Sequence, residues 1–293
     1  MAETKKEYSN FITVKGILAE KNLEIKQTKT GKTYISGTIA VKTGEESVFK
    51  FKVNTYEKTK NGSINPMYPG LVTAMNEHKS IASHGNEADA VEVRAQLDID
   101  DYKGRDGNLV SYVNRVASSV KRISKDETFG AQGFVHLFIE RTRMEVNKDG
   151  EETGRAVING YVRKFNGELF PVEFKLADKA GIDMLVNGDV EKGALFDCMY
   201  RLVNSTVTRT KVKEFDFGEP RVQTFTSVVN ENVIVSAGRE TGNLAYTTEE
   251  FNKALVEREL KLKEIENGTA STGSGNTTTQ VQASKPKVDD FVF

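Results

Sequence analysis

Hydrophobic and polar residues alternate along three consecutive segments near the start of the chain. Residues 11–18, 34–41 and 47–53 alternate or cluster β-branched and aromatic residues between polar turn residues. This period of two predicts three half-buried β-strands. In Phe49-Lys50-Phe51-Lys52 the alternation places both aromatic side chains on one face and both lysines on the other. Phe51 recurs as Phe174 in the second half of the chain, which favours a core position for it.

The pattern then changes to one helix and two further strands. Residues 71–81 form a helical candidate, and residues 91–99 and 109–120 return to strand-like spacing. Thr30-Gly31-Lys32 and Thr43-Gly44-Glu45 supply turns between the first three strands. The predicted order is strand, strand, strand, helix, strand, strand.

The same order recurs in the second half of the chain. Residues 11–53 align without a gap with residues 134–176, at a fixed offset of 123 positions. The identities fall on turn glycines and apolar strand residues, which a shared backbone would constrain: Phe11/Phe134, Thr30/Thr153, Gly31/Gly154, Ile35/Ile158, Gly37/Gly160, Gly44/Gly167, Glu45/Glu168, Phe51/Phe174 and Lys52/Lys175. A helical candidate at 177–186 and strands at 195–208 and 222–235 complete the second copy, with turns at Asp149-Gly150 and Asn166-Gly167.

This order of elements is that of the five-stranded oligonucleotide-binding barrel, the OB-fold. The sequence thus predicts a mainly β protein with two tandem OB-fold-like barrels, residues 1–125 and 130–245. A C-terminal helix is predicted over 247–266, because Thr247 and Glu250 have capping-box spacing and Phe251, Leu255, Leu262 and Ile265 recur at helical intervals. Its apolar stripe is expected to dock on the second barrel or on another subunit.

The last segment, residues 267–293, is predicted to be a disordered linker with an acidic and aromatic tip. Its linker consists of small polar residues that cannot bury enough surface to become ordered. The tip carries Asp289, Asp290, Phe291 and Phe293. Such a tip is either a frayed chain end or a peptide that docks on other proteins, and the body of the protein must distinguish the two.

Charge and cysteine content exclude several classes of protein. Lys and Arg total 41 against 42 Asp and Glu, so the chain is not a globally basic nucleic-acid binder. Up to Lys60, however, twelve lysines outnumber seven acids, which fits either a polyanion-binding face or solvated lysines on exposed strands. The single cysteine, Cys198, lies in an apolar run and is expected to be a buried core residue, not a nucleophile. Without a secretion signal or membrane span, we expect a soluble, cytoplasmic protein, in the host cytoplasm if viral.

Candidate enzyme signatures fail at the level of spacing. Thr30-Gly31-Lys32-Thr33 resembles the end of a phosphate loop, but Lys26 stands where that loop requires glycine. His78, His84 and His136 have no metal-ligand spacing with one another or with Cys198. Asp98, Asp100 and Asp101 leave open a metal-dependent nuclease, although we expect them to lead into a solvated hairpin loop. We therefore predict a protein that is not an enzyme, with no cofactor and no metal.

The residues for binding a single strand are present in both copies. Such binding needs cations that follow the phosphates and aromatic faces on which bases stack. For each tyrosine, packing or plain surface placement is the alternative to base contact. The candidate nucleic-acid-binding residues are Lys15, Lys26, Lys29, Lys32, Tyr34, Lys50, Lys52, Tyr56, Tyr102 and Tyr112 in the first copy, and Arg155, Tyr161, Arg163, Arg209, Lys211 and Lys213 in the second.

Together these features resemble single-stranded DNA-binding proteins of bacteriophage type. Members of that class combine OB-folds with an acidic C-terminal tail that ends in Phe, which Asp289, Asp290 and Phe293 match in kind, while Phe291-Val292 replaces the usual Ile-Pro of bacterial members. The resemblance implies binding and protection of single-stranded DNA in replication, recombination and repair, with partner proteins docking on Asp289, Asp290, Phe291 and Phe293. The alternative is a β-rich phage structural or assembly protein with protein-binding barrels. The sequence leaves open which barrel binds DNA, the preference for DNA over RNA, and the oligomeric state.

Overall fold

The structure, a computed structural model, describes residues 8–188, 190–213, 221–241 and 244–268, without the side chains of 206–227. Its first half contains β1 (Asn10–Gln27), β2 (Thr33–Gly44), β3 (Ser47–Tyr56), α1 (Tyr68–Glu77), α2 (Ile81–His84), the short helix η1 (Gly85–Glu87), β4 (Ala90–Lys103) and β5 (Leu109–Arg122). Its second half contains β6 (Gly130–Val146), β7 (Glu152–Arg163), β8 (Leu169–Leu176), α3 (Lys179–Leu185), β9 (Leu195–Lys213) and β10 (Arg221–Glu240). The helix α4 (Thr248–Glu266) follows.

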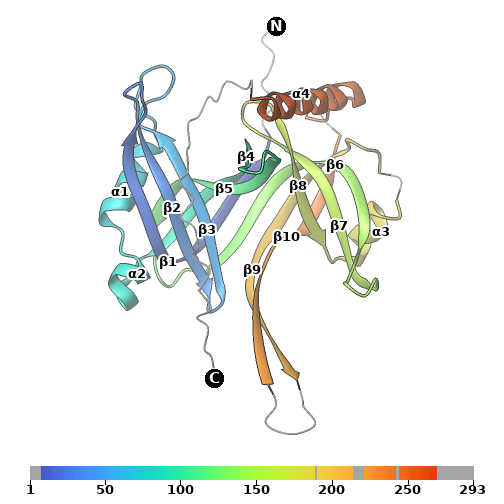
Figure 1. Ribbon diagram of the computed structural model, residues 1–293, viewed down its shortest axis with the longest axis horizontal. Helices are drawn as coiled ribbons and strands as arrows, with labels where there is room; N and C mark the ends of the chain where they lie inside the picture. The colour runs from blue at the N-terminus through green and yellow to red at the C-terminus, as the bar shows by residue number, and fades with distance from the viewer. Residues whose placement is uncertain (1–7, 189, 214–220, 242–243, 269–293) are drawn as a thin grey trace.

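The strands of each half close into a barrel. In the first half β1 pairs with β2, β2 with β3, β3 in parallel with β5, β5 with β4, and β4 again with β1. The second half repeats this circuit through β6, β7, β8, β10 and β9. Closure pairs strands that would otherwise expose edges. The predicted fold class is confirmed: the protein is mainly β, with two OB-fold-like barrels side by side and a C-terminal helix (Figure 1).

The duplication is present, but its register differs from the gapless alignment. Ile39 lies opposite Phe51 in the first barrel, and Ile158 lies opposite Phe174 in the second. Ile158 therefore corresponds to Ile39, whereas the gapless alignment matched it with Ile35. Phe51 follows Ile39 by 12 residues, whereas Phe174 follows Ile158 by 16. The β7–β8 hairpin is therefore longer by four residues, and a fixed offset cannot hold across all three strands.

One type of tight turn recurs in both barrels. The amide of Gly31, of Gly107 and of Gly150 each donates to the carbonyl three residues earlier. Their φ angles of 76°, 82° and 85° lie in the left-handed region that favours glycine. The predicted turns at Thr30-Gly31-Lys32 and Asp149-Gly150 are therefore confirmed, and Gly31 corresponds to Gly150, not to Gly154.

The alternation read from the sequence separates core from surface correctly on β3. Phe49 and Phe51 are buried, while Lys50 and Lys52 lie on the outer face. Phe174 and Cys198 are also buried, as predicted. Burial raises the pKa of the Cys198 thiol to about 12, so it stays protonated and unreactive at neutral pH.

The two barrels are joined through their first strands. β1 and β6 pair in antiparallel fashion over a short stretch, which links all ten strands into one sheet. Phe11 lies opposite Phe134, and their rings stack with centroids 5.1 Å apart. Backbone pairing and ring stacking therefore hold the barrels in a defined relation.

The helices agree with the predictions except in one boundary. The candidate at 71–81 is broken, because the backbone becomes extended at His78 after α1 and a separate turn of helix begins at Ile81. The predicted capping box at the start of α4 is present: Thr247 Oγ1 accepts from the Glu250 amide and a Glu250 carboxylate oxygen accepts from the Thr247 amide. Among the helices in the described part of the chain, none is long and apolar enough to cross a bilayer.

Candidate nucleic-acid interface

A pair of tyrosines lies on the outer face of the first barrel. Tyr34 on β2 is directly opposite Tyr56 on β3, and their ring centroids are 5.5 Å apart with the ring planes tilted by 42°. The neighbouring Ile35 and Thr55 point into the barrel and are buried. Alternation therefore turns the two tyrosine rings outward together, and Tyr56 is 37% exposed. These two aromatic faces are available to a ligand.

Lysines without ion-pair partners lie on the same outer face as this tyrosine pair. Lys29 and Lys32 lie in or beside the β1–β2 turn near Tyr34, and Lys50 lies further along β3, six residues before Tyr56; all three are exposed. None of the three has an ion pair with another described residue. Lys26 lies opposite Tyr34, and its hydrogen bond with Glu24 raises the pKa of its amine. The face therefore offers several cations that can exchange solvent for phosphate.

The other lysines predicted in this barrel are partly neutralised. Lys52 binds Asp100 at 2.8 Å. Lys15 binds Glu127 at 2.6 Å, and that hydrogen bond raises the pKa of the Lys15 amine. Their positive charge is therefore shared with an acid, unlike that of Lys50.

Two further predicted tyrosines lie on the β4–β5 hairpin. Tyr102 and Tyr112 are 44% and 61% exposed, and both point outward from adjacent strands. Asp100, directly opposite Tyr112, accepts hydrogen bonds from Lys52 and from the amide of Asn114. This contact connects the outer surface of the hairpin with β3 of the same barrel.

The three aspartates considered for a nuclease do not converge. They lie within β4, and each binds a different cation: Asp98 binds Lys164, Asp100 binds Lys52 and Asp101 binds Arg258. As predicted, they lead into a largely exposed hairpin loop, between the end of β4 at Lys103 and the start of β5 at Leu109. Within the described residues no cluster of acidic, His or Cys side chains is arranged to hold a metal ion.

The predicted residues of the second barrel are engaged in internal contacts. Arg155 binds Glu231 at 2.6 Å and lies 3.6 Å from Glu145. Tyr161 packs edge-on against Phe251 of α4, and burial, followed by the nearby Glu140, raises the pKa of its phenol.

Arg163, also in this barrel, lies over the ring of Tyr8, 4.7 Å from its centroid. Arg163 thus faces the N-terminal segment and α4. The structure does not bring Arg155, Tyr161 and Arg163 together with the tyrosine pair of the first barrel.

The remaining predicted residues lie on parts whose side chains are not described. Arg209, Lys211 and Lys213 belong to β9, which pairs with β10 along a long two-stranded arm that extends beyond the barrel (Figure 1). Their side chains lie outside the described residues. Asp289, Asp290, Phe291 and Phe293 also fall outside them.

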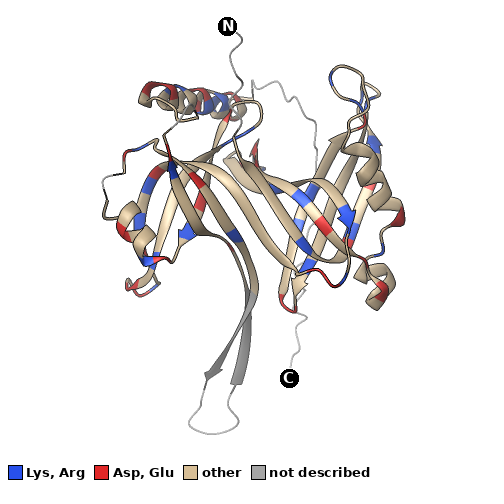
Figure 2. Ribbon diagram, turned by 180° about the vertical axis from the view of Figure 1, so that it is seen from behind, with Lys and Arg blue, Asp and Glu red and all other residues tan. Residues whose placement is uncertain are grey.

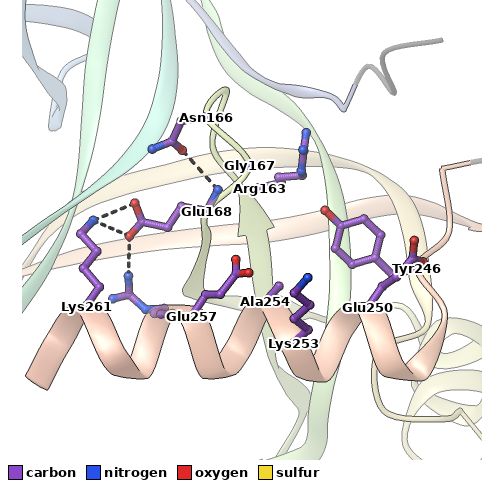
Figure 3. A pocket seen from close by; sticks show the side chains of 11 residues that line it. Arg163, Asn166, Gly167, Glu168, Tyr246, Glu250, Lys253, Ala254, Glu257 and Lys261 are labelled. Carbon is purple, nitrogen blue, oxygen red and sulfur yellow. Dashed lines mark hydrogen bonds and ion pairs between the residues drawn. The ribbon is translucent and has the colours of Figure 1, made fainter. Parts of the chain in front are cut away.

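A cavity of about 530 Å³ lies between α4 and the β7–β8 turn (Figure 3). At one end of it Lys261 binds Glu168 at 2.6 Å, and Arg258 binds both Glu168 and Asp101. Arg258 and Asp101 are almost completely buried. Burial would raise the pKa of Asp101, but hydrogen bonds from Arg258 and Ser111 outweigh it, so this pKa is lowered. The cavity wall thus contains a charged link between the barrels.

Sequence reasoning missed the role of Arg258. The signal was available, because Arg258 falls on the same helical stripe as Phe251, Leu255, Leu262 and Ile265 and interrupts it with a charge. A charged side chain on the docking face of a helix requires a buried partner. Asp101, the partner, comes from the other barrel and could not be identified from local pattern.

Comparison with solved structures finds similar chain arrangements at low identity. The single-stranded DNA-binding protein from Thermus aquaticus is 12% identical, with a TM-score of 0.48, over 83% of this chain and 98% of that one. A deletion mutant of the same protein is 13% identical, with a TM-score of 0.47 and the same coverage. No curated protein matches the chain in sequence. Residues 9–268, from the start of the first barrel to the end of α4, match the YorF family, and the chain belongs to that family.

Proposed function

We propose that this protein binds single-stranded DNA without sequence preference, through outward-facing tyrosines and unpaired lysines on its OB-fold-like barrels. The observation that carries the proposal is the Tyr34–Tyr56 pair, with Lys29 and Lys32 beside it and Lys50 further along the same face of β3. None of these three lysines has an ion-pair partner among the described residues. Stacking serves every base alike, and lysines follow a backbone that every sequence shares. Such a surface favours binding without sequence readout.

The chemistry of this face favours a single strand over a duplex. Bases in a duplex are stacked on one another and hide their ring faces, whereas those of a single strand can stack on tyrosine. Charged residues of both signs lie along the strands of both barrels (Figure 2). The number of charges therefore does not identify a phosphate-binding surface. Such a surface is identified by lysines that form no ion pair with a nearby acid.

We further propose that the protein coats and protects DNA during replication, recombination or repair, as a protein of bacteriophage type. The support is the sequence resemblance: tandem barrels with a C-terminal tip of Asp289, Asp290, Phe291 and Phe293. In this proposal the tip recruits partner proteins of the same processes. Arg209, Lys211 and Lys213 of β9, whose side chains lie outside the described residues, belong to this proposal on the sequence alone.

Titration with fluorescent oligonucleotides tests the binding function. The full chain is titrated with single-stranded and duplex oligonucleotides of equal length at several salt concentrations. We expect tighter binding to the single strand, and a linear fall of log affinity with log salt, because bound lysines release counterions. Equal affinity for both forms, or affinity independent of salt, would support instead a structural or assembly protein whose barrels bind other proteins.

A further inference from the structure

The two barrels carry different residues at corresponding positions of the same outer face. The cross-strand pairs of buried residues show which positions of the two barrels correspond. Ile39 lies opposite Phe51 in the first barrel, and Ile158 lies opposite Phe174 in the second. Counting equal steps from Phe51 and Phe174 matches Lys50 with Glu173.

Counting likewise from Ile39 and Ile158 matches Tyr34 with Thr153 and Lys32 with Glu151. Lys26, which lies opposite Tyr34, corresponds to Glu145, whose carboxylate accepts a hydrogen bond from the Thr153 hydroxyl. Three lysines of the first barrel are thus three glutamates in the second, and a tyrosine is a threonine.

Ion pairing strengthens this contrast in charge. Glu145 binds Lys175 at 2.9 Å, and Glu173 binds the same amine at 3.0 Å. Arg155 lies between Glu145 and Glu231. The cations of the second face are therefore held by its own acids, while Lys32 and Lys50 on the first face have no such partner among the described residues. A phosphate approaching the second face would have to displace these acids.

The second barrel instead supports α4 on another part of its outer surface. Phe138 and Leu195, from β6 and β9, form an apolar cluster with Leu169 and with Phe251 of α4. Phe138 and Phe251 stack with ring centroids 5.7 Å apart. Arg258 then extends the contact of α4 to Asp101 of the first barrel. This barrel thus has a second set of contacts, which holds α4 against both barrels.

We propose that the barrels divide the work: of the two corresponding faces, β2–β3 of the first barrel binds single-stranded DNA and β7–β8 of the second does not, while the second barrel holds α4. This inference rests on the proposed function and says which of the two corresponding faces takes part in it. Both halves of the chain form the barrel, but only the first half has the lysines and the tyrosine for DNA binding on this face.

Two turn lysines provide a matched test in the full chain. Lys29 and Lys148 occupy corresponding positions, each two residues before the left-handed glycine of its turn, and both are exposed. Neither has an ion pair with another described residue. Lys29→Glu and Lys148→Glu therefore make the same change of charge in the same local structure. Lys50→Glu adds a second position on the first face.

Binding of a fluorescent oligothymidylate is measured for the wild type and the three variants at several salt concentrations. We expect Lys29→Glu and Lys50→Glu each to weaken binding about fivefold or more and to reduce the salt slope by about one. Lys148→Glu should stay within about twofold of the wild type. If the wild type binds but Lys148→Glu loses as much affinity as Lys29→Glu, or neither first-barrel variant loses affinity, the division of work is wrong and the proposed function stands. A wild type that shows no preference for single strands over duplex overturns the proposed function, and the division of work with it.

Discussion

Tyr34 and Tyr56 show how one residue position can decide between packing and binding. The buried neighbours Ile35 and Thr55 contribute to the barrel interior. The two tyrosine side chains point to the opposite face of their strands and are not part of that core, although they contact each other. Replacing their rings should therefore affect a ligand more than the fold.

Tyr34→Ala should weaken binding of single-stranded DNA by roughly 1 to 3 kcal/mol, the range for loss of one stacking contact. Tyr34→Phe should bind almost as well as the wild type, because stacking uses the ring and not the hydroxyl. Oligonucleotide titration measures both, and circular dichroism verifies that the barrels remain folded. Equal loss in Tyr34→Ala and Tyr34→Phe would indicate that the hydroxyl, not the ring face, makes the contact.

At the scale of an element, α4 is attached by an apolar cluster and by ion pairs. Phe251 enters the aromatic cluster on the second barrel, and Arg258 binds acids of both barrels. Removing one partner of a buried ion pair leaves the other charge without compensation. Arg258 is therefore more important to the position of α4 than its charge alone suggests.

Arg258→Met should destabilise the protein by roughly 3 to 5 kcal/mol, because Asp101 is left buried without its cation. Thermal unfolding measures the loss. Adding Asp101→Asn to Arg258→Met should restore part of it. Lys263→Met, on the exposed side of the same helix, is the control and should change the midpoint little. If Arg258→Met and Lys263→Met unfold at the same temperature, the buried pair does not stabilise the docked helix.

The attachment of α4 should also depend on pH in the acid range. The folded pKa of Asp101 lies below its ordinary value of 3.8. A lowered carboxyl pKa contributes stability that is fully present above the ordinary value and is lost as the pH falls through the folded pKa. As the pH is lowered past about 4, the midpoint temperature of thermal unfolding should therefore decrease in the wild type. In Asp101→Asn the midpoint temperature should decrease less steeply over the same pH range. Parallel pH profiles for the two proteins would contradict this assignment.

At the scale of the whole molecule, an acidic tip and a face with unpaired lysines belong to one chain. Asp289 and Asp290 carry the charge of the tip, and Lys29, Lys32 and Lys50 that of the face. A tethered acidic peptide competes with nucleic acid for such a face, and because the competition is electrostatic it weakens as salt rises. DNA binding would then release the tip for partner proteins.

Deletion of residues 289–293 should tighten binding of single-stranded DNA at low salt and change it little at high salt. Changing Asp289 and Asp290 to Asn, with both phenylalanines kept, should reproduce most of the gain, since charge is responsible. The measurement is the same oligonucleotide titration at two salt concentrations. Unchanged or weaker binding after deletion would show that the tip does not screen this face.

The sequence by itself determined the elements, because their signals are local. Alternation on β3 separated Phe49 and Phe51 from Lys50 and Lys52, and Thr247 with Glu250 marked the start of α4. The two copies and their order predicted the barrels for the same reason, since apolar periodicity and turn glycines act within a few residues. The predicted helix at 71–81 failed at His78, where the local pattern did not indicate the extended backbone.

Only the tertiary structure decided the register between the copies and the partners of the charges. The β7–β8 hairpin has four more residues between its paired core positions than the β2–β3 hairpin, so Ile158 corresponds to Ile39 and not to Ile35. Arg258 pairs with Asp101 from a distant strand of the other barrel. Ion pairs form between side chains that folding brings together, whatever their separation along the chain. The sequence therefore supplied lysines and arginines in both barrels, and the fold determined which of the described ones are left unpaired for a ligand.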